Sequence, residues 1–526
     1  MDNPVNKWLV ALTVMLPTLM VIIDTSVVNV SLDHIRGSLS AGIDEATWSI
    51  TSYLAANAVI VPMTGWLSRF FGRRRYLLFS VTLFTASSLL CGLAWNIQSL
   101  IVFRVLQGIA GGSLQPISQS VLLETFPPVQ HGMAMAIFGI GIMFGPIVGP
   151  LLGGWITDNW SWHWIFFINI PIGAVSLVMT SLFIRDPSYM KRTALTVDYV
   201  GLILLGLWVG CLQMILDRGQ REDWFASGLI VTLAAVTTIA FVFFVFREIS
   251  VRYPIVDLGV FRDYSFCIGN VVVFFVLVNL FGSIVLLPIY LQSLMGYTAS
   301  LAGIVLGPGG LAILVTMPLV GRLITRINPK FVVAVGVIIT AWANVLMSRF
   351  TLGADFFSVF WPRVVMGVGM GMIFIPLTTL TLSGIRREEM GNATSIFNLV
   401  RNVGGGLGVA FVTTMVARRS QFHQARLVDS LTPFDPNFWW SSQQAAEIVQ
   451  RKGLPAASAS QGGLGVLYEQ FLRQASMMSF NDAFHVLAVM MLCMLPLVLL
   501  MKHVRHGPEP EATPAAAAPP EERAAA

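Results

Sequence analysis

The segment Arg104-Val-Leu-Gln-Gly-Ile-Ala-Gly-Gly112 recurs 259 residues later as Arg363-Val-Val-Met-Gly-Val-Gly-Met-Gly371. Extended without a gap to Gly149 and Gly408, the two segments match at 11 of 46 positions. The matches include an arginine and five glycines, which apolar composition alone does not bring into one register. Internal symmetry in a membrane chain is typical of transporters built from two half-bundles, with the substrate site where the halves meet.

The composition places the chain in a membrane. Of its 526 residues 55% are hydrophobic and 11% charged, and the mean hydropathy is +0.75, which excludes a soluble globular domain. Apolar windows of about 20 residues, each long enough to cross the bilayer as a helix, recur along the chain, whereas a β-barrel would show short alternating segments. We therefore expect an all-α polytopic membrane protein. Its fourteen predicted spans are approximately 8–31, 47–67, 76–95, 98–123, 131–157, 162–184, 197–216, 225–246, 266–291, 299–324, 331–350, 357–382, 392–417 and 481–502.

The basic residues predict the orientation. With a cytoplasmic N-terminus, 19 Lys and Arg fall in cytoplasmic segments and four in the short loops on the other side. Both termini are then cytoplasmic, and the first span, which lacks a cleavage site, is a retained helix. The net charge of +5 reflects this bias and does not indicate nucleic-acid binding. The four cysteines lie singly in different spans, so neither a disulfide framework nor a metal site is expected.

The repeat predicts the domain organisation, because spans 4 and 5 match spans 12 and 13. Spans 7 and 8 are then an extra pair between two six-helix halves. We assign residues 1–190 to the N-terminal half, 191–260 to the inserted pair, 261–506 to the C-terminal half and 507–526 to a disordered tail rich in Pro, Ala and Glu. Residues 418–480 are expected to form a periplasmic helical hairpin, either as a docking site for a partner or as a solvated loop without one.

Asp24 is the strongest single candidate for a functional residue. It is the only acid well inside a span of the first half, where a charge costs roughly 2.5–3.5 kcal/mol on insertion scales. Burial disfavours the ionised carboxyl, whereas a nearby cation favours it. A carboxyl between these influences can load and release a proton, although an Asp that only caps a kink or bonds within the core remains the alternative.

Arg104 begins a polar stripe on span 4. On a regular helix Arg104, Gln115, Ser118 and Gln119 share one face, with Gln107 at its edge. Such a face is expected to line a wet cavity, and together with Asn57 of span 2 these residues are candidates for the substrate cavity. Arg104 either pairs with Asp24 or extends to the outer interface. Arg363 is its symmetric residue, and the same register places Ser283 opposite Asp24, which would confine the proton site to the first half.

Span 5 is unusually rich in glycine and proline. Gly141, Gly145, Gly149 and Gly153 recur every four residues and leave one helix face bare for close packing. Pro146 and Pro150 are expected to bend the helix, and Gly154 adds to the density of small residues. Both tight packing and a gate hinge fit this pattern.

These motifs, in order along the chain, resemble those of the major facilitator superfamily. Gly65–Arg75 resembles its loop motif after span 2, Arg104–Gly112 its span-4 motif, and Gly141–Gly154 the span-5 motif of its drug exporters. Ile23–Val30 and Trp164–Gly173 are similar to the span-1 and span-6 motifs of fourteen-span drug:proton antiporters. The resemblance covers nearly the whole chain and is greatest to the EmrB type, the inner-membrane pump of Gram-negative tripartite exporters.

The resemblance implies roles for these residues. Asp24 and Arg104 would be the proton-coupling pair, the span-5 motif would suppress leak, and the loop motif would gate the cytoplasmic side through Gly65, Arg69, Gly72, Arg73 and Arg74. Many relatives carry an aspartate where this chain has Arg69, which leaves a gate based on that acid in doubt. The implied substrates are hydrophobic, amphipathic or weakly acidic toxic compounds. A HlyD-type membrane-fusion protein and an outer-membrane channel are the implied partners, and the proton gradient replaces any cofactor.

Other functional classes fit less well. A membrane enzyme needs clustered catalytic groups, and the seven histidines form no metal-spaced set. A channel or receptor does not require two similar halves or a single acid within a span. An importer or exporter of one specific metabolite remains the alternative, because a fold does not fix direction. The sequence therefore favours a proton-coupled multidrug exporter of the bacterial inner membrane that works by alternating access.

Overall fold

A computed structural model of the chain describes residues 6–127, 130–186, 198–251, 254–324, 326–429, 436–451 and 455–501. Every regular element in these ranges is a helix, and 13 helices are long and apolar enough to cross a membrane. A further helix, α6 (His131–Asn159), has 29 residues and a length of about 44 Å, enough for a fourteenth crossing. The predicted class, an all-α polytopic bundle, is confirmed. The predicted tail at 507–526 lies outside the described residues.

The N-terminal half consists of six spans, whose buried apolar side chains form two clusters, one of which continues into the C-terminal half. Its helices are α1 (Lys7–Ser38), α2 (Ile43–Phe71), α3 (Arg73–Gly92), α4 (Ile97–Gly111) with α5 (Leu114–Thr125), α6, and α7 (Trp164–Phe167) with α8 (Asn169–Phe183). Within this half α1 packs on α6 and α8, α2 on α4, and α3 on α4 and α8. The fourth span runs from Ile97 to Thr125 as one crossing, as the sequence predicts, and its helical hydrogen bonding is interrupted at Gly112 and Ser113, which keep right-handed helical angles.

The C-terminal half repeats this arrangement. Its helices are α11 (Tyr264–Ile289) with a π-helical turn η4 (Tyr290–Leu294), α12 (Ala299–Leu323), α13 (Pro329–Met347), α14 (Phe356–Leu382), α15 (Met390–Val428), α16 (Pro436–Arg451) and α17 (Ala456–Leu500). The short turns η3 (Leu258–Arg262) and η5 (Arg387–Glu389) precede α11 and α15. Here α11 packs on α15, α12 on α14, and α13 on α14 and α17, the same neighbours as in the first half.

Polar side chains at the helix starts explain several boundaries. Asn96 accepts a hydrogen bond from Ser99 N (2.7 Å) and caps α4, Asp263 accepts from Phe266 N (2.8 Å) and caps α11, and Asp355 accepts from Ser358 N (3.0 Å) and caps α14. Each cap satisfies a backbone donor that the first turn of a helix leaves free. Gly72, between α2 and α3, has φ +84°, a conformation that favours glycine.

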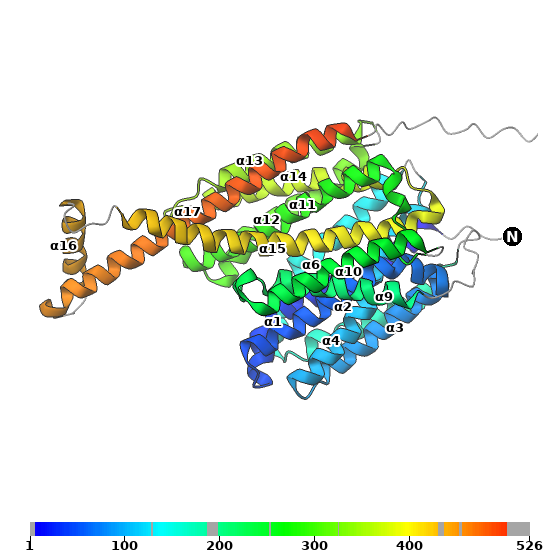
Figure 1. Ribbon diagram of the computed structural model, residues 1–526, viewed down its shortest axis with the longest axis horizontal. Coiled ribbons are helices and arrows are strands. Elements are labelled where there is room, and N and C mark those ends of the chain that lie inside the picture. The colour runs from blue at the N-terminus through cyan, green and yellow to red at the C-terminus, as the bar shows by residue number, and fades with distance from the viewer. Residues whose placement is uncertain are drawn as a thin grey trace, which may run out of the picture.

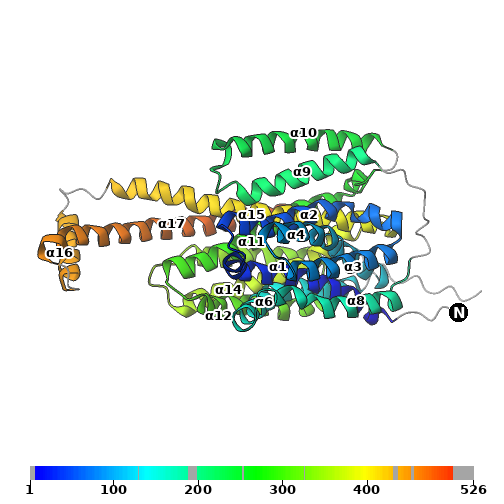
Figure 2. The ribbon, with the colours of Figure 1, turned by 90° about the horizontal axis from the view of Figure 1, so that it is seen from below.

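The inserted pair is a separate hairpin on one side of the bundle. Its helices α9 (Tyr199–Arg218) and α10 (Gly228–Ser250) are joined through η2 (Trp224–Ala226), and Figure 2 shows them outside the other helices. α9 packs on α2 and α15, one helix of each half, whereas α10 packs on α9. Asp198, at the start of α9, pairs with Arg247 of α10 at 3.1 Å. Burial alone would raise the pKa of Asp198, but the hydrogen bonds from Arg247 and Gly201 N–H lower it below its ordinary value.

The two ends of the bundle differ. The start of α1 and the end of α17 lie together at one end, called here the terminal end, and α16 projects at the opposite, hairpin end (Figure 1). Chain ends on one side require an even number of crossings, which fits fourteen. α15 has 39 residues and α17 has 45, about 58 and 68 Å long, so both extend well beyond a bilayer core of about 30 Å.

The predicted hairpin region 418–480 comprises these two extensions and α16. An ion cluster joins the extensions near their base. Asp482 of α17 accepts from Arg419 Nε at 2.6 Å and lies 2.7 Å from His423 Nε2, both of α15. The cluster therefore fixes the two long helices side by side where they leave the bundle.

Close contacts at glycines show how the halves correspond. A Cβ at Gly108 would lie 2.5 Å from the carbonyl O of Tyr53, and a Cβ at Gly367 would collide with the carbonyl O of Gly309. The two contacted residues, Tyr53 and Gly309, are 256 positions apart. Likewise a Cβ at Gly145 would meet Ile22, and a Cβ at Gly404 would meet Phe274. Ile22 and Phe274 are 252 positions apart.

The register of the first spans follows from this second pair of contacts. It places Val276, and not Ser283, at the position of Asp24, so the predicted partner position was wrong. The offset between the halves is 259 residues in spans 4 and 5, 256 at the contacts of span 2 and 252 at those of span 1. The single offset of 259 therefore missed seven extra residues of the second half, four of them between its first two spans, where η4 lies.

Candidate functional site

Asp24 lies inside the N-terminal half on α1, with its carboxylate surrounded by donors. Arg104 Nη1 donates to Oδ2 at 2.6 Å, while Gln107 Nε2 and Asn169 Nδ2 donate to Oδ1 at 2.9 and 2.8 Å. The exposed side-chain fractions of Arg104 and Asp24 are 1% and 0%. The structure therefore brings the two predicted residues into a fully buried ion pair.

Arg104 is held by groups other than Asp24 as well. Its Nε donates to the carbonyl O of Ser49 at 3.1 Å, and Nη1 also donates to Gln107 Oε1 at 2.6 Å. The guanidinium lies 4.1 Å from the ring centroid of Tyr53, a cation–π contact. These contacts fix Arg104 from both α2 and α4, so it does not extend to the outer interface.

The hydrogen bonds indicate the protonation state that this arrangement fits. Both carboxylate oxygens of Asp24 accept, and an ionised carboxylate has acceptors only, whereas a protonated one must also donate. Protonation would cancel the attraction to Arg104 and disturb at least one of the three bonds. Asn169 also donates to Ser88 Oγ at 3.0 Å, so the same network reaches α3. The network around Asp24 therefore joins α1 to α3, α4 and α8 through side-chain hydrogen bonds.

The span-5 glycines determine how α1 is positioned. Cβ atoms at Gly141, Gly145 and Gly149 would collide with side chains of α1, and one at Gly153 would lie 3.0 Å from Val27 Cγ1. The bare face of α6 therefore packs directly on the helix that carries Asp24. Gly154 lies outside this face, with no atom within 4 Å of its Cβ position. The side chains of Pro146 and Pro150 lie outside the described residues, and α6 is continuous from His131 to Asn159.

The predicted polar stripe divides between two surroundings. Gln107 joins the Asp24 pair, and Ser118 donates to the carbonyl O of Val14 at 2.7 Å, so both contact α1. Gln119 faces the other half, where its Oε1 accepts from Asn398 Nδ2 at 2.7 Å. Gln115 and Asn57 are half-buried. Of the five predicted cavity residues, the structure thus places two in the core of the N-terminal half and Gln119 between the halves.

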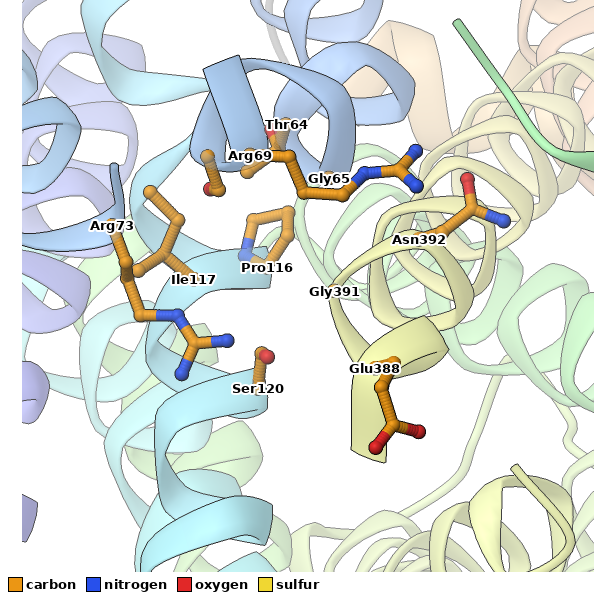
Figure 3. Close-up of a pocket in the computed structure, with 11 residues that line it drawn as sticks. Thr64, Gly65, Arg69, Arg73, Pro116, Ile117, Ser120, Glu388, Gly391 and Asn392 are labelled. Carbon is orange, nitrogen blue, oxygen red and sulfur yellow. The ribbon is translucent and has the colours of Figure 1, made fainter. Parts of the chain in front are cut away.

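The loop motif lies where the halves meet at the terminal end. Gly65 N donates to Ser395 Oγ at 3.0 Å, and a Cβ at Gly65 would lie 2.8 Å from Asn392 Cα. Figure 3 shows the small pocket beside this contact, with Arg69 and Arg73 on one side and Glu388, Gly391 and Asn392 on the other.

Two further arginines of the motif stay within their own half. Arg73 forms a bidentate pair with Glu124 of α5, with both distances 2.7 Å. Arg74 N donates to Asp186 Oδ1 at 2.8 Å, and its Nη2 donates to the carbonyl O of Ser181 at 2.6 Å. These contacts link α3 to α5 and to the end of α8, so both arginines brace the N-terminal half.

The contact between Gly65 and Asn392 has a symmetric counterpart between Gly132 and Gly321. A Cβ at Gly132 of α6 would lie 3.1 Å from the carbonyl O of Gly321, and one at Gly321 of α12 would lie 3.2 Å from that of Gly132. Nearer the hairpin end of α12, Gly303 and Gly307 have no atom within 4 Å of their Cβ positions. Glycine contacts at two symmetric places therefore join the halves at the terminal end.

Several residues of the site were not predicted. Asn169 lies inside the span-6 motif, and a lone amide in an apolar span was an available signal. Tyr53 was not singled out, because nothing in the sequence shows that its ring lies under Arg104. Asn398 and Arg401 of α15 were also missed. They lie in the repeated segment at positions where the first half has Gly139 and Ile142, so their polarity departs from the repeat.

Comparison with known proteins agrees with this architecture. A family model described as Major Facilitator Superfamily matches residues 14–409. The chain is 36% identical over 512 residues to the fatty acid resistance protein FarB of Neisseria gonorrhoeae, covering 96% of this chain and 99% of that relative. It is also 36% identical over 488 residues to the multidrug export protein EmrB of Escherichia coli strain K12, covering 93% and 94%.

A solved structure supports the fold independently of close sequence similarity. The crystal structure of the human organic anion transporter MFSD10 matches with a TM-score of 0.57 at 12% identity, covering 93% of this chain and 100% of that one. At this identity the likeness concerns the arrangement of the helices alone.

Proposed function

The chain belongs to the major facilitator superfamily, and from that premise we propose that it exports toxic amphipathic compounds from the cell in exchange for protons, as an EmrB-type transporter. The observation that carries the proton-coupling part is the buried carboxylate of Asp24, held by three donors inside a half-bundle. The names of the two bacterial relatives, which refer to fatty acid resistance and multidrug export, support the export of such compounds.

Asp24 would be the group that carries the proton. An ionised Asp24 draws α1, α4 and α8 together through Arg104, Gln107 and Asn169. A proton on Asp24 removes the charge that Arg104 faces, so the three helices hold together less tightly and favour another packing. Because α6 packs directly on α1, any movement of α1 is passed to α6, which also contacts the C-terminal half at α12 and α14. This gives a physical route from protonation to the contact between the halves.

Alternating access follows from the contacts at the terminal end. Positive charge predicts that this end faces the cytoplasm. The contacts of Gly65 with Asn392 and of Gly132 with Gly321 would then close the cytoplasmic side, which corresponds to the state that releases substrate outward. Opening requires both glycine contacts and the Gln119–Asn398 bond to separate.

The proton gradient is sufficient as the source of energy. Each proton that moves inward contributes roughly 2.3 kcal/mol per 100 mV of membrane potential, and the pH difference adds to this. No cofactor is needed in this mechanism, because the only chemical step is proton transfer to and from Asp24.

The hairpin is the proposed contact for a periplasmic partner. α15 and α17 carry α16 away from the bundle (Figure 1), and Trp439 and Trp440 of α16 are exposed. Exposed aromatic side chains on a projecting element suit a protein interface. A membrane-fusion protein of the HlyD type, connected to an outer-membrane channel, is the partner proposed from the family resemblance.

The test asks whether a pH gradient drives transport of a substrate and whether a substrate gradient drives transport of protons. Proteoliposomes that contain the intact protein are loaded with a lipophilic dye, and the external pH is lowered. Proton entry is expected to drive the dye out, and dye added without a pH gradient is expected to move protons in the opposite direction. If dye moves together with protons in the same direction, the protein is an importer, and if protons never move, the coupling proposal fails.

A further inference from the structure

Arg401 of α15 is a buried cation that the proton site does not use. Only 8% of its surface is exposed, and its Nη1 donates to Asn398 Oδ1 at 3.1 Å. Its Nε atom, which is also buried, has no hydrogen-bond partner. No acidic side chain in the described ranges forms an ion pair with it. An unneutralised guanidinium at this depth is unfavourable unless an anion joins it.

The surroundings of Arg401 differ from those of Arg104. Arg104 has Asp24 as its counter-ion, and its Nε is bonded to Ser49. Arg401 instead lies over an aromatic ring, 5.0 Å from the centroid of Phe374 on α14. One side of this guanidinium is therefore apolar, and its donors lack an acceptor of opposite charge.

Arg401 also lies where the two halves meet. Asn398, which accepts its hydrogen bond, itself donates to Gln119 of the N-terminal half at 2.7 Å. Phe374 approaches the same half, because a Cβ at Gly139 of α6 would lie 3.5 Å from its ring. Arg363, the other buried arginine of this half, also has an Nε without a hydrogen-bond partner, but it packs on Gly309 of α12, and its Nη1 contacts Met366 Sδ of its own helix. Of the two arginines, Arg401 is the one joined to the opposite half.

We propose that Arg401 binds the acidic head group of an amphipathic substrate. This inference rests on the proposed transport function and adds the ligand class, an organic anion whose carboxylate meets the guanidinium and whose apolar body lies along Phe374. A guanidinium presents two parallel donors to a carboxylate, and Nε is one of the donors that this geometry uses. The anion reaches Arg401 when the halves separate.

Binding at this point also affects the contact between the halves. A carboxylate on Arg401 competes with Asn398 Oδ1 for Nη1, so Asn398 loses one of its partners. Because the same side chain bonds to Gln119, the occupied site and the inter-half bond share one residue. The charge of the substrate therefore affects the hydrogen bonds of Asn398, the residue that joins the halves.

The test compares three probes with the same chain and different head groups. Dodecanoate, dodecanamide and dodecyltrimethylammonium are bound to the intact protein in lipid nanodiscs at neutral pH, and empty nanodiscs give the lipid partition. The parent protein is expected to prefer dodecanoate to dodecanamide. Arg401→Gln should weaken dodecanoate binding on the order of tenfold or more, as for a lost charged hydrogen bond, and change dodecanamide binding by less than about twofold.

Two further variants separate charge from folding. Arg401→Lys keeps the charge and should retain a preference for dodecanoate, even if Arg401→Gln does not fold. Arg363→Gln removes a buried arginine of the same half away from the interface and should leave the preference unchanged. Equal losses for all three probes in Arg401→Gln, no preference in the parent protein, or a Lys variant without preference would overturn the proposal.

The assay needs no proton gradient. A failure to prefer anions, together with intact dye–proton exchange, would refute this site while leaving the proposed function in place.

Discussion

Asp24 on α1 and Val276 on α11 occupy equivalent positions in the two half-bundles, and only the first carries a titratable group. The glycine contacts of α6 and α15 define this equivalence, since Gly145 meets Ile22 where Gly404 meets Phe274. Both halves carry the arginine, as Arg104 and Arg363, but Arg363 faces Met366 where Arg104 faces Gln107. Within the part of the chain that the structure describes, only the first half therefore places an acid beside this arginine.

The hydrogen bonds of Asn169 predict a loss of coupled transport. Asn169→Ala removes one of three donors to Asp24 and the link from α8 to Ser88 of α3. Substrate-driven proton movement in proteoliposomes should therefore be slower than in the parent. Asn279→Ala, which removes a buried amide of the second half, is the control and should keep the parental rate. An unchanged rate in Asn169→Ala would show that this amide is not needed for coupling.

Close packing of α2 on α4 predicts a strong effect at Gly108. A Cβ there would lie 2.5 Å from the backbone O of Tyr53, so Gly108→Ala should destabilise the protein by about 1–3 kcal/mol, as overpacking does. Gly206→Ala is the matched control, because the nearest atom to its Cβ position is 3.9 Å away. The midpoint of thermal unfolding is measured for both purified variants. Equal midpoints for Gly108→Ala and Gly206→Ala would contradict the close packing of α2 on α4.

The contact at Gly65 predicts a change in the balance between conformations. In Gly65→Ala the new Cβ meets the backbone of Asn392 in the other half, which opposes closure of the terminal end. Spin labels at Phe71 and Ser383 should report longer distances in this variant than in the parent. Gly154→Ala, whose Cβ has open space, should reproduce the parental distances. Unchanged distances in Gly65→Ala would mean that this contact does not control closure.

The bidentate pair of Arg73 and Glu124 predicts a stability difference between two kinds of ion pair. Its side chains are 6% and 9% exposed, so Glu124→Gln leaves a buried charge and should cost about 3–5 kcal/mol. The exposed pair of Arg386 and Glu389 is the control, and Glu389→Gln should leave the unfolding midpoint unchanged. Similar midpoints for the two variants would count against a bracing role for Arg73.

Much of the architecture followed from the sequence because it depends on local signals. Continuous apolar windows predicted the spans, and glycines at intervals of four predicted the bare face of α6 that packs on α1. The contact between Asp24 and Arg104 was also predicted as one of two possibilities, since a buried acid and a buried base in neighbouring spans stabilise each other when paired.

The remaining features depend on geometry that the sequence does not show. Gln107 and Gln119, assigned to one stripe, lie in different surroundings, because Gln107 bonds to Asp24 within the N-terminal half and Gln119 bonds to Asn398 of the other half. Seven extra residues between the first and fourth spans of the second half, four of them near η4, shift the register of α11, which made Ser283 the wrong counterpart of Asp24. The charge of Arg401 within a predicted span departs from the repeat, but the sequence does not show that the folded guanidinium lies beside Phe374 without a counter-ion.

Counterflow and proton-driven transport, measured together on Asp24→Asn, test the central claim most directly. In proteoliposomes the variant should still exchange labelled for unlabelled substrate, because the fold and the substrate path remain. It should fail to move substrate against its gradient when a pH difference is imposed, because no carboxyl is left to bind the proton. A variant that accumulates substrate as the parent does would contradict the account, since Asp24 would then be a structural residue.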